Sequence, residues 1–126
     1  MARKPRLKRV YEAASPEDGQ RILVDRLWPR GLAKDKAKID LWLRDLSPSD
    51  ALRKRFHGHP ETWSAFRKAY AQELKEPAAQ AAVAELRAKL RQGPVTLLYA
   101  ARDEEKNNAV ALRDWLAGDK WGGNRG

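Results

Sequence analysis

Three short stretches of the chain have the hydrophobic pattern of β-strands. Residues 6–11 alternate charged and apolar side chains, which predicts a strand with Leu7 facing inward. Residues 21–27 contain an uninterrupted apolar run at 22–24, and residues 95–100 read VTLLYA. Uninterrupted runs of this kind indicate strands that are buried on both faces, as in a parallel sheet.

The remaining apolar positions recur mostly at helical spacing. After Gly31, a stripe predicts a helical segment, and it consists of Leu32, Ile39, Trp42, Leu43 and Leu46. Turn and capping residues then predict a single turn at 15–19 and a short helix that starts at 47–50 and carries Leu52 and Phe56. A longer helix is predicted from the spacing of Trp63, Phe66, Tyr70 and Leu74 and ends at Pro77, and another is predicted at 78–91. A last helix is expected to begin at Asp103, as its N-cap, and to end at Gly118.

The order of these elements predicts an α/β fold. We expect a single domain over residues 1–126, with a small, mainly parallel sheet of about three or four strands flanked by about five helices. The helices between the second and third strands would form a long crossover connection. A basic arm at residues 1–5 and a tail at residues 119–126 are expected to be flexible.

The composition excludes several classes of protein. The chain has no cysteine, which excludes disulfides, thiolate metal sites and a cysteine nucleophile. It has no signal peptide and no run of about 18 apolar residues, so we expect a cytoplasmic protein that does not enter a membrane. No cofactor-binding motif is present, and His57 and His59 lack further ligands nearby. We therefore predict no cofactor and no metal.

The formal net charge of +9 points to a negatively charged partner. Five basic residues crowd the first ten positions: Arg3, Lys4, Arg6, Lys8 and Arg9. Such an arm can contact phosphates, but it can also be a solvated segment that leads into the first strand. The charge has a second explanation, because arginine and alanine are common in proteins from GC-rich genomes.

Two segments that follow predicted strands carry the candidate site. Ligands of open parallel sheets bind beyond the carboxyl ends of the strands, and here those ends lead into DRLWPRG (25–31) and YAARDEEKNN (99–108). If both strands run parallel to the first, the two segments meet at one edge. Asp25 is the candidate base or nucleophile. The candidate ligand-binding residues are Arg26, Trp28, Arg30, Lys34, Tyr99, Arg102, Asn107 and Asn108.

Arg30 is the strongest of these candidates. Pro29 restricts Trp28 to an extended backbone, and Gly31 can adopt a positive φ. Together they would fix the direction of the Arg30 guanidinium, whose planar fork suits a carboxylate or a phosphate.

Each candidate also has a structural interpretation. Arg30 could form a buried salt bridge with Asp25 or Asp103, and Asp25 could simply pair with Arg26. The Trp28 ring could belong to the core, and either asparagine could complete a helix cap.

The chain resembles the YeaO-like branch of the bacterial domain-of-unknown-function family 488. The resemblance covers nearly the whole chain and rests on RVYEAASPEDGQRILVDRLWPRGLAK, LSPSDALRKRF, ETWSAFRKAYAQEL and VTLLYAARDEEKNNAVAL. It implies a small α/β domain and brings no established activity. The family usually has Asn followed by His where this chain has Asn107 and Asn108.

Three functions fit these observations. The first is a site for a small anionic ligand, a nucleotide or a phosphorylated metabolite, at the carboxyl edge of the sheet, with or without catalysis. The alternative is a nucleic-acid-binding module that uses the basic surface, whose binding would fall steeply with salt. The third is an interaction protein whose exposed tryptophans, such as Trp121, meet a partner. The sequence does not predict the oligomeric state.

Overall fold

The fold is built around one sheet of four parallel strands. A computed structural model describes residues 4–118 of the chain. The strands lie in the order β1-β4-β2-β3, and every neighbouring pair is parallel. They are β1 (Arg6–Arg9), β2 (Gln20–Leu23), β3 (Leu41–Trp42) and β4 (Val95–Tyr99). This architecture confirms the α/β class.

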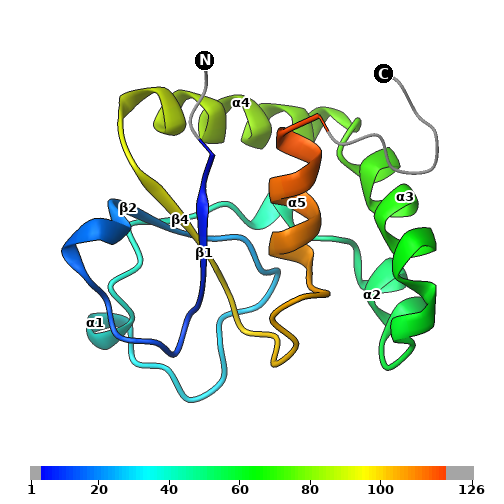
Figure 1. The fold of residues 1–126 in the computed structure, drawn as a ribbon, viewed down its shortest axis with the longest axis horizontal. Helices are drawn as coiled ribbons and strands as arrows, with labels where there is room; N and C mark the ends of the chain where they lie inside the picture. The colour runs from blue at the N-terminus through cyan, green and yellow to red at the C-terminus, as the bar shows by residue number, and fades with distance from the viewer. Residues whose placement is uncertain (1–3, 119–126) are drawn as a thin grey trace.

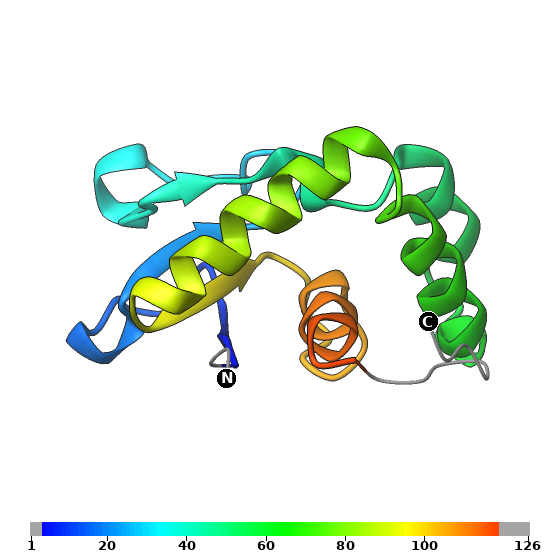
Figure 2. The same ribbon diagram turned by 90° about the horizontal axis from the view of Figure 1, so that it is seen from above.

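Five α-helices and three short 3₁₀ turns complete the described part. The α-helices are α1 (Lys34–Ala37), α2 (Asp50–Phe56), α3 (Trp63–Glu73), α4 (Pro77–Gln92) and α5 (Asn108–Leu116). The 3₁₀ turns are Pro16–Asp18, Arg44–Leu46 and Pro60–Thr62. Figures 1 and 2 show α1 and α3 at opposite ends of the molecule, with the strands between them.

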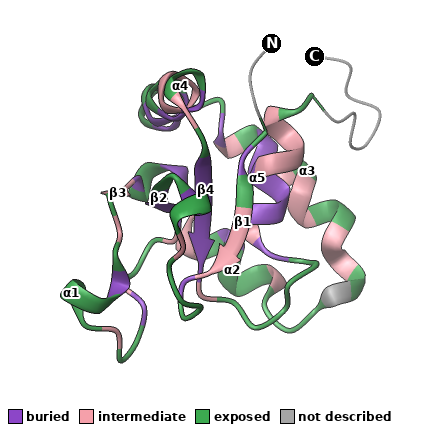
Figure 3. Ribbon diagram, turned by 60° about the vertical axis from the view of Figure 1, so that its left-hand side comes forward, coloured by how far each residue is buried: buried purple, intermediate pink, exposed green. Residues whose placement is uncertain are grey.

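The two faces of the sheet have different coverings. Side chains alternate along a strand, so Ile22 and Leu97 face the main core, which also contains buried residues of α2, α3, α4 and α5. Leu23 and Leu98 face the opposite way and form a smaller cluster with Val10. Partly buried side chains of the segment 28–42 pack against that cluster. Strand β4 is therefore buried on both faces, as Figure 3 shows.

A buried ionic network closes the amino end of the sheet. Asp18 accepts a hydrogen bond from Arg21 Nη1 at 2.6 Å and from Lys8 Nζ at 2.9 Å. Asp18 is 3% exposed and Arg21 is 4% exposed. Arg21 also donates to the backbone oxygens of Ala37 and Lys38, so the network joins β1, β2 and the end of α1. These interactions hold the pKa of Asp18 at about 2 against the opposing effect of burial.

Three predicted elements differ from the structure. The second strand, predicted over residues 21–27, ends at Leu23 because the chain turns away after Val24. The helical stripe predicted after Gly31 is wrong, because α1 has only four residues and Leu41–Trp42 form an edge strand beside β2. Lys38 ends α1 in the left-handed conformation, with φ of 53°. Apolar side chains of this stretch cover the second face of the sheet instead of forming one helical face.

The last helix begins later than expected. Asp103 is not its N-cap, because its carboxylate accepts from the backbone N–H groups of Glu105 and Lys106 and so closes a separate turn. The helix begins at Asn108, and Asn107 caps it by accepting from the Val110 N–H at 2.9 Å. The tail at 119–126, with Trp121, and most of the basic arm lie outside the residues that this description covers.

Candidate functional site

The turn that follows β2 is held in place by its own side chains. Gly31 has a φ of 74°, as the sequence predicted for this position. The Trp28 indole donates to the Leu32 backbone oxygen at 2.7 Å, and the Tyr11 hydroxyl donates to the Arg30 backbone oxygen at 2.9 Å. These bonds hold the later part of the turn, from Trp28 to Leu32, so the side chains there start from a defined backbone.

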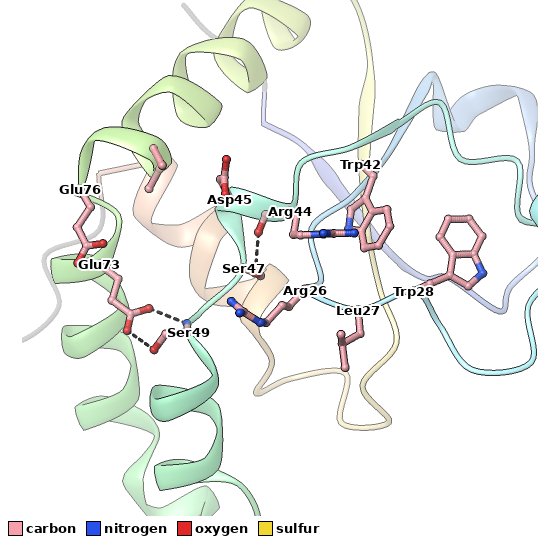
Figure 4. Close-up of a pocket in the computed structure, with 12 residues that line it drawn as sticks. Arg26, Leu27, Trp28, Trp42, Arg44, Asp45, Ser47, Ser49, Glu73 and Glu76 are labelled. Atoms are coloured by element: carbon pink, nitrogen blue, oxygen red, sulfur yellow. Dashed lines mark hydrogen bonds between the residues drawn. The ribbon is translucent and has the colours of Figure 1, made fainter.

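An open groove of about 640 Å³ lies beside the carboxyl ends of β2 and β3 (Figure 4). One wall is formed by the turn after β2, by β3 and by the start of the 3₁₀ turn after β3. Its residues are Arg26, Leu27, Trp28, Trp42 and Arg44. The opposite wall comes from the segment before α2 and from the junction of α3 and α4: Asp45, Ser47, Ser49, Glu73, Glu76, Ala78 and Ala79. We call this the carboxyl-edge groove.

Two indoles and two guanidiniums characterise the first wall. Trp28 and Trp42 meet edge to face with ring centroids 5.7 Å apart, and the Arg44 guanidinium lies 4.2 Å from the Trp42 ring centroid. Arg44 makes no ion pair with any residue in 4–118, so its stacked guanidinium keeps its donors free for a ligand. Arg26 contacts Asp50, with 3.3 Å between Nε and Oδ1.

The second wall is acidic, but one of its carboxylates is already bound. Glu73 accepts from the Ser49 backbone N–H at 2.8 Å and from the Ser49 hydroxyl at 2.6 Å. Asp45 and Glu76 are exposed and form no ion pair with any residue between 4 and 118. An anion in the groove would therefore be attracted to the arginine wall and repelled by the opposite one.

Asp25 lies between the ends of β2 and β4, beside α5, and is not among the residues that line the groove. Its Oδ2 accepts from the Ala100 N–H at 2.9 Å, and its Oδ1 accepts from the Asn108 amide at 3.1 Å. The same amide nitrogen also donates to the Val24 backbone oxygen. Burial raises the pKa of Asp25 above its ordinary value, although both hydrogen bonds act in the opposite direction.

The structure brings together only part of the predicted set. Arg26 and Trp28 line the groove, while Asp25 and Asn108 meet behind it. Asn107 serves as the cap of α5, and Tyr99 is buried in β4. Three predicted ligand-binding residues are exposed and lie outside the groove lining: Arg30, Lys34 and Arg102. Arg30 forms no salt bridge with Asp25 or Asp103 in the described part of the chain.

Sequence reasoning missed the other half of the basic wall. Trp42 and the region around Arg44 were assigned to a helical stripe, whereas they belong to β3 and the turn after it. One signal was available, because Leu41, Trp42 and Leu43 form a second short apolar run bounded by Asp40 and Arg44. A short run bounded in this way is also typical of a strand.

The described residues, 4–118, show neither a metal-binding cluster nor a membrane-spanning helix. No three His, Asp or Glu side chains there come together in a group that could hold a metal ion. None of the helices in that range combines the length and the hydrophobicity that crossing a bilayer requires.

Comparison with known proteins places the chain in a family. The model of the DUF488-N3i family, described as "Inactive DUF488-N3 subclade", matches residues 4–121. The chain belongs to this family. The resemblance predicted from DRLWPRG and the other motifs is thereby confirmed, and it extends over both halves of the groove.

The relatives of this DUF488-N3i protein carry no assigned activity. Uncharacterized protein YeaO of Escherichia coli is 44% identical over 110 residues, which cover 86% of this chain and 93% of the relative. Uncharacterized protein Rv3073c of Mycobacterium tuberculosis is 41% identical over 113 residues, which cover 90% of this chain and 93% of the relative. No solved structure shows a significant match to the chain.

Proposed function

We propose that this protein binds a small anionic ligand, a nucleotide or a phosphorylated metabolite, in the carboxyl-edge groove, and that it does so without catalysis. The observation that carries the proposal is the wall on which the Arg26 and Arg44 guanidiniums accompany two indoles. Guanidiniums bind phosphate oxygens through paired N–H donors, and indole rings contact the flat face of a base.

The size and position of the groove support a small ligand. A volume of about 640 Å³ lies within the range of roughly 300–1,000 Å³ that is usual for small-molecule sites. The groove also lies beside the carboxyl ends of two parallel strands, where ligands of open α/β sheets bind.

Two observations favour binding over catalysis. Asp25, the candidate base, is not among the residues that line the groove, and its carboxylate oxygens accept hydrogen bonds from Ala100 and Asn108 instead. A general base must lie within hydrogen-bond reach of the proton that it removes from the substrate. The description of the family as an inactive subclade agrees with this interpretation.

The test is calorimetric titration of the wild type with AMP and with inorganic phosphate. Arg44→Gln should weaken AMP binding by about 10- to 100-fold, because a hydrogen bond to a charged group contributes about 1.5–3 kcal/mol. Arg91→Gln is the matched control, since it removes the same charge from an exposed position on α4. Arg91 lies 13 residues beyond Ala78, about 20 Å along the helix.

Three outcomes distinguish the possibilities. Loss of binding in Arg44→Gln but not in Arg91→Gln supports the groove. Loss in Arg30→Gln alone would move the site to the other side of the turn after β2. Equal losses in Arg44→Gln and Arg91→Gln, or no binding by the wild type, would refute the proposal.

Nucleic acid is the second candidate ligand. Arg53, Lys54 and Arg55 form an exposed basic run on α2, near Arg26 through the contact of Arg26 with Asp50. Binding of an oligonucleotide in place of AMP, with an affinity that falls steeply between 50 and 200 mM salt, would favour this alternative.

A further inference from the structure

Asp50 lies at the rim of the carboxyl-edge groove and contacts two arginines through a single oxygen. Its Oδ1 is 3.3 Å from Arg26 Nε and 2.9 Å from Arg53 Nη2. The side chains of all three residues are about half exposed, so water and ions reach each of them. Arg26 is therefore shared between the groove, which it lines, and a carboxylate outside it.

The backbone next to Asp50 is fixed. Asp50 is the first residue of α2, and the N-cap of that helix is Ser49, whose hydroxyl oxygen accepts from the Leu52 N–H. Ser49 in turn donates two hydrogen bonds to Glu73 of α3. These bonds hold the start of α2 against α3, in the position where the Asp50 carboxylate lies 3.3 Å from Arg26 Nε.

The two arginines that share Asp50 differ in what they can do. Arg53 lies three residues beyond Asp50 on the same helix, on the outer side of α2, and is not among the residues that line the groove. Arg26 does line it. An anion in the groove could therefore bind the Arg26 guanidinium in place of Asp50. The Asp50 carboxylate would remain paired with Arg53.

We infer that Asp50 limits the affinity of the groove for anions, as an internal competitor that an anionic ligand must displace from Arg26. The inference rests on the proposed function. A phosphate monoester, with nearly two negative charges, competes for the guanidinium better than a singly charged carboxylate does. Asp50 thus lowers the affinity of the groove by the same factor for every anion that takes Arg26, whereas Arg44 has no such competitor in the described residues.

The test is a double-mutant cycle with the wild type, Asp50→Asn, Arg26→Gln and the double variant. Calorimetric titration with AMP should show about 1.5- to 5-fold tighter binding by Asp50→Asn, the range expected from breaking an exposed ion pair. In the Arg26→Gln background, the same substitution should change the affinity by less than about 1.5-fold. Titration with acetate adds a check, since loss of the competitor should raise the affinity for acetate and for AMP by the same factor, whereas loss of a general repulsion would raise the affinity for the more highly charged AMP more.

Asp35→Asn is the matched control, because Asp35 is exposed on α1 and its loss changes the net charge equally. A circular dichroism melt checks that each variant is folded, and Asp50→Ser is a second variant with the same expectation. If the wild type binds AMP and Asp50→Asn binds it no more tightly, the inference is wrong while the proposed function stands. A gain of equal size in the Arg26→Gln background would also overturn it, since Asp50 would then act only through its general field. Absence of AMP binding in every variant would refute both.

Discussion

Removing the carboxylate of Asp18 should destabilise the fold more than removing any exposed carboxylate. Asp18 accepts hydrogen bonds from Arg21, Lys8 and the backbone of Ser15, and its side chain is 4% exposed. The variant Asp18→Asn keeps the size of the side chain and removes its charge. Arg21 then stays buried with only carbonyl oxygens as acceptors, while Lys8, at 19% exposure, can turn toward water.

The magnitude follows from the pKa of Asp18. Its value falls from 3.8 to about 2 on folding, which corresponds to about 2 kcal/mol of stability at neutral pH. Breaking a buried ion pair usually costs about 3–5 kcal/mol. We expect about 2–3 kcal/mol here, because Lys8 can be hydrated and Arg21 keeps two carbonyl acceptors.

Urea unfolding at pH 7 measures the effect, with Asp35→Asn as the exposed control. Asp35→Asn should lie within about 0.5 kcal/mol of the wild type, as is usual for surface substitutions. Because the folded pKa of Asp18 is depressed, its contribution is complete above pH 5 and is lost as the pH falls toward 2. About half of it should be gone at pH 3. A difference below about 1 kcal/mol between Asp18→Asn and the wild type at pH 7 would refute this reasoning.

Two further predictions concern the ends of β2. Asn108→Ala should raise the pKa of Asp25 further, because it removes a donor to the ionised carboxylate; an unchanged pKa in a carboxyl NMR titration would contradict this. The protonated form of Asp25 is favoured by folding, so the stability that it contributes is lost as the pH rises through the folded pKa. Gly19→Ala should cost more than about 2 kcal/mol, because φ is +62° and the new Cβ would lie 2.2 Å from the Pro94 oxygen. Gly31→Ala, with φ of +74° and open space, should cost about 1 kcal/mol, and equal melting temperatures for the two variants would contradict the steric argument.

The elements predicted most accurately from the sequence are those whose pattern fits only one kind of secondary structure. The run at 95–100 became β4, whose five residues are all buried, because only a central parallel strand needs apolar side chains on both faces. The helix start predicted at 47–50 and the helix predicted at 78–91 are found as α2 and α4, although Ser49 rather than Ser47 caps α2, and Pro77, predicted to end the preceding helix, opens α4.

The errors arose where one residue spacing fits two structures. Leu32, Ile39 and Trp42 are spaced along the chain as on a helix, but the same side chains cover the second face of the sheet from a loop and a short strand. Strand β3 has two residues, too few to show an alternating pattern. Asp103 is a good N-cap residue, yet its side chain satisfies a turn four residues before the cap that the helix uses.

The groove lies at a different place from the predicted site for a related reason. The sequence placed it where the segments after β2 and β4 meet, and those segments do meet, through Asp25, Ala100 and Asn108. Their polar groups are directed at one another, which satisfies buried donors and acceptors. The groove instead opens on the other side of β2, next to a strand that the sequence did not predict.

Asp25 and the groove occupy separate places at the carboxyl edge of the sheet. A catalytic carboxylate and a binding groove must meet at the substrate, but here Asp25 is bound behind the groove by two internal donors. The groove is lined by guanidiniums and indoles and not by Asp25, so the proposed ligand binding does not require the Asp25 carboxylate. The proposed function is therefore ligand binding without catalysis.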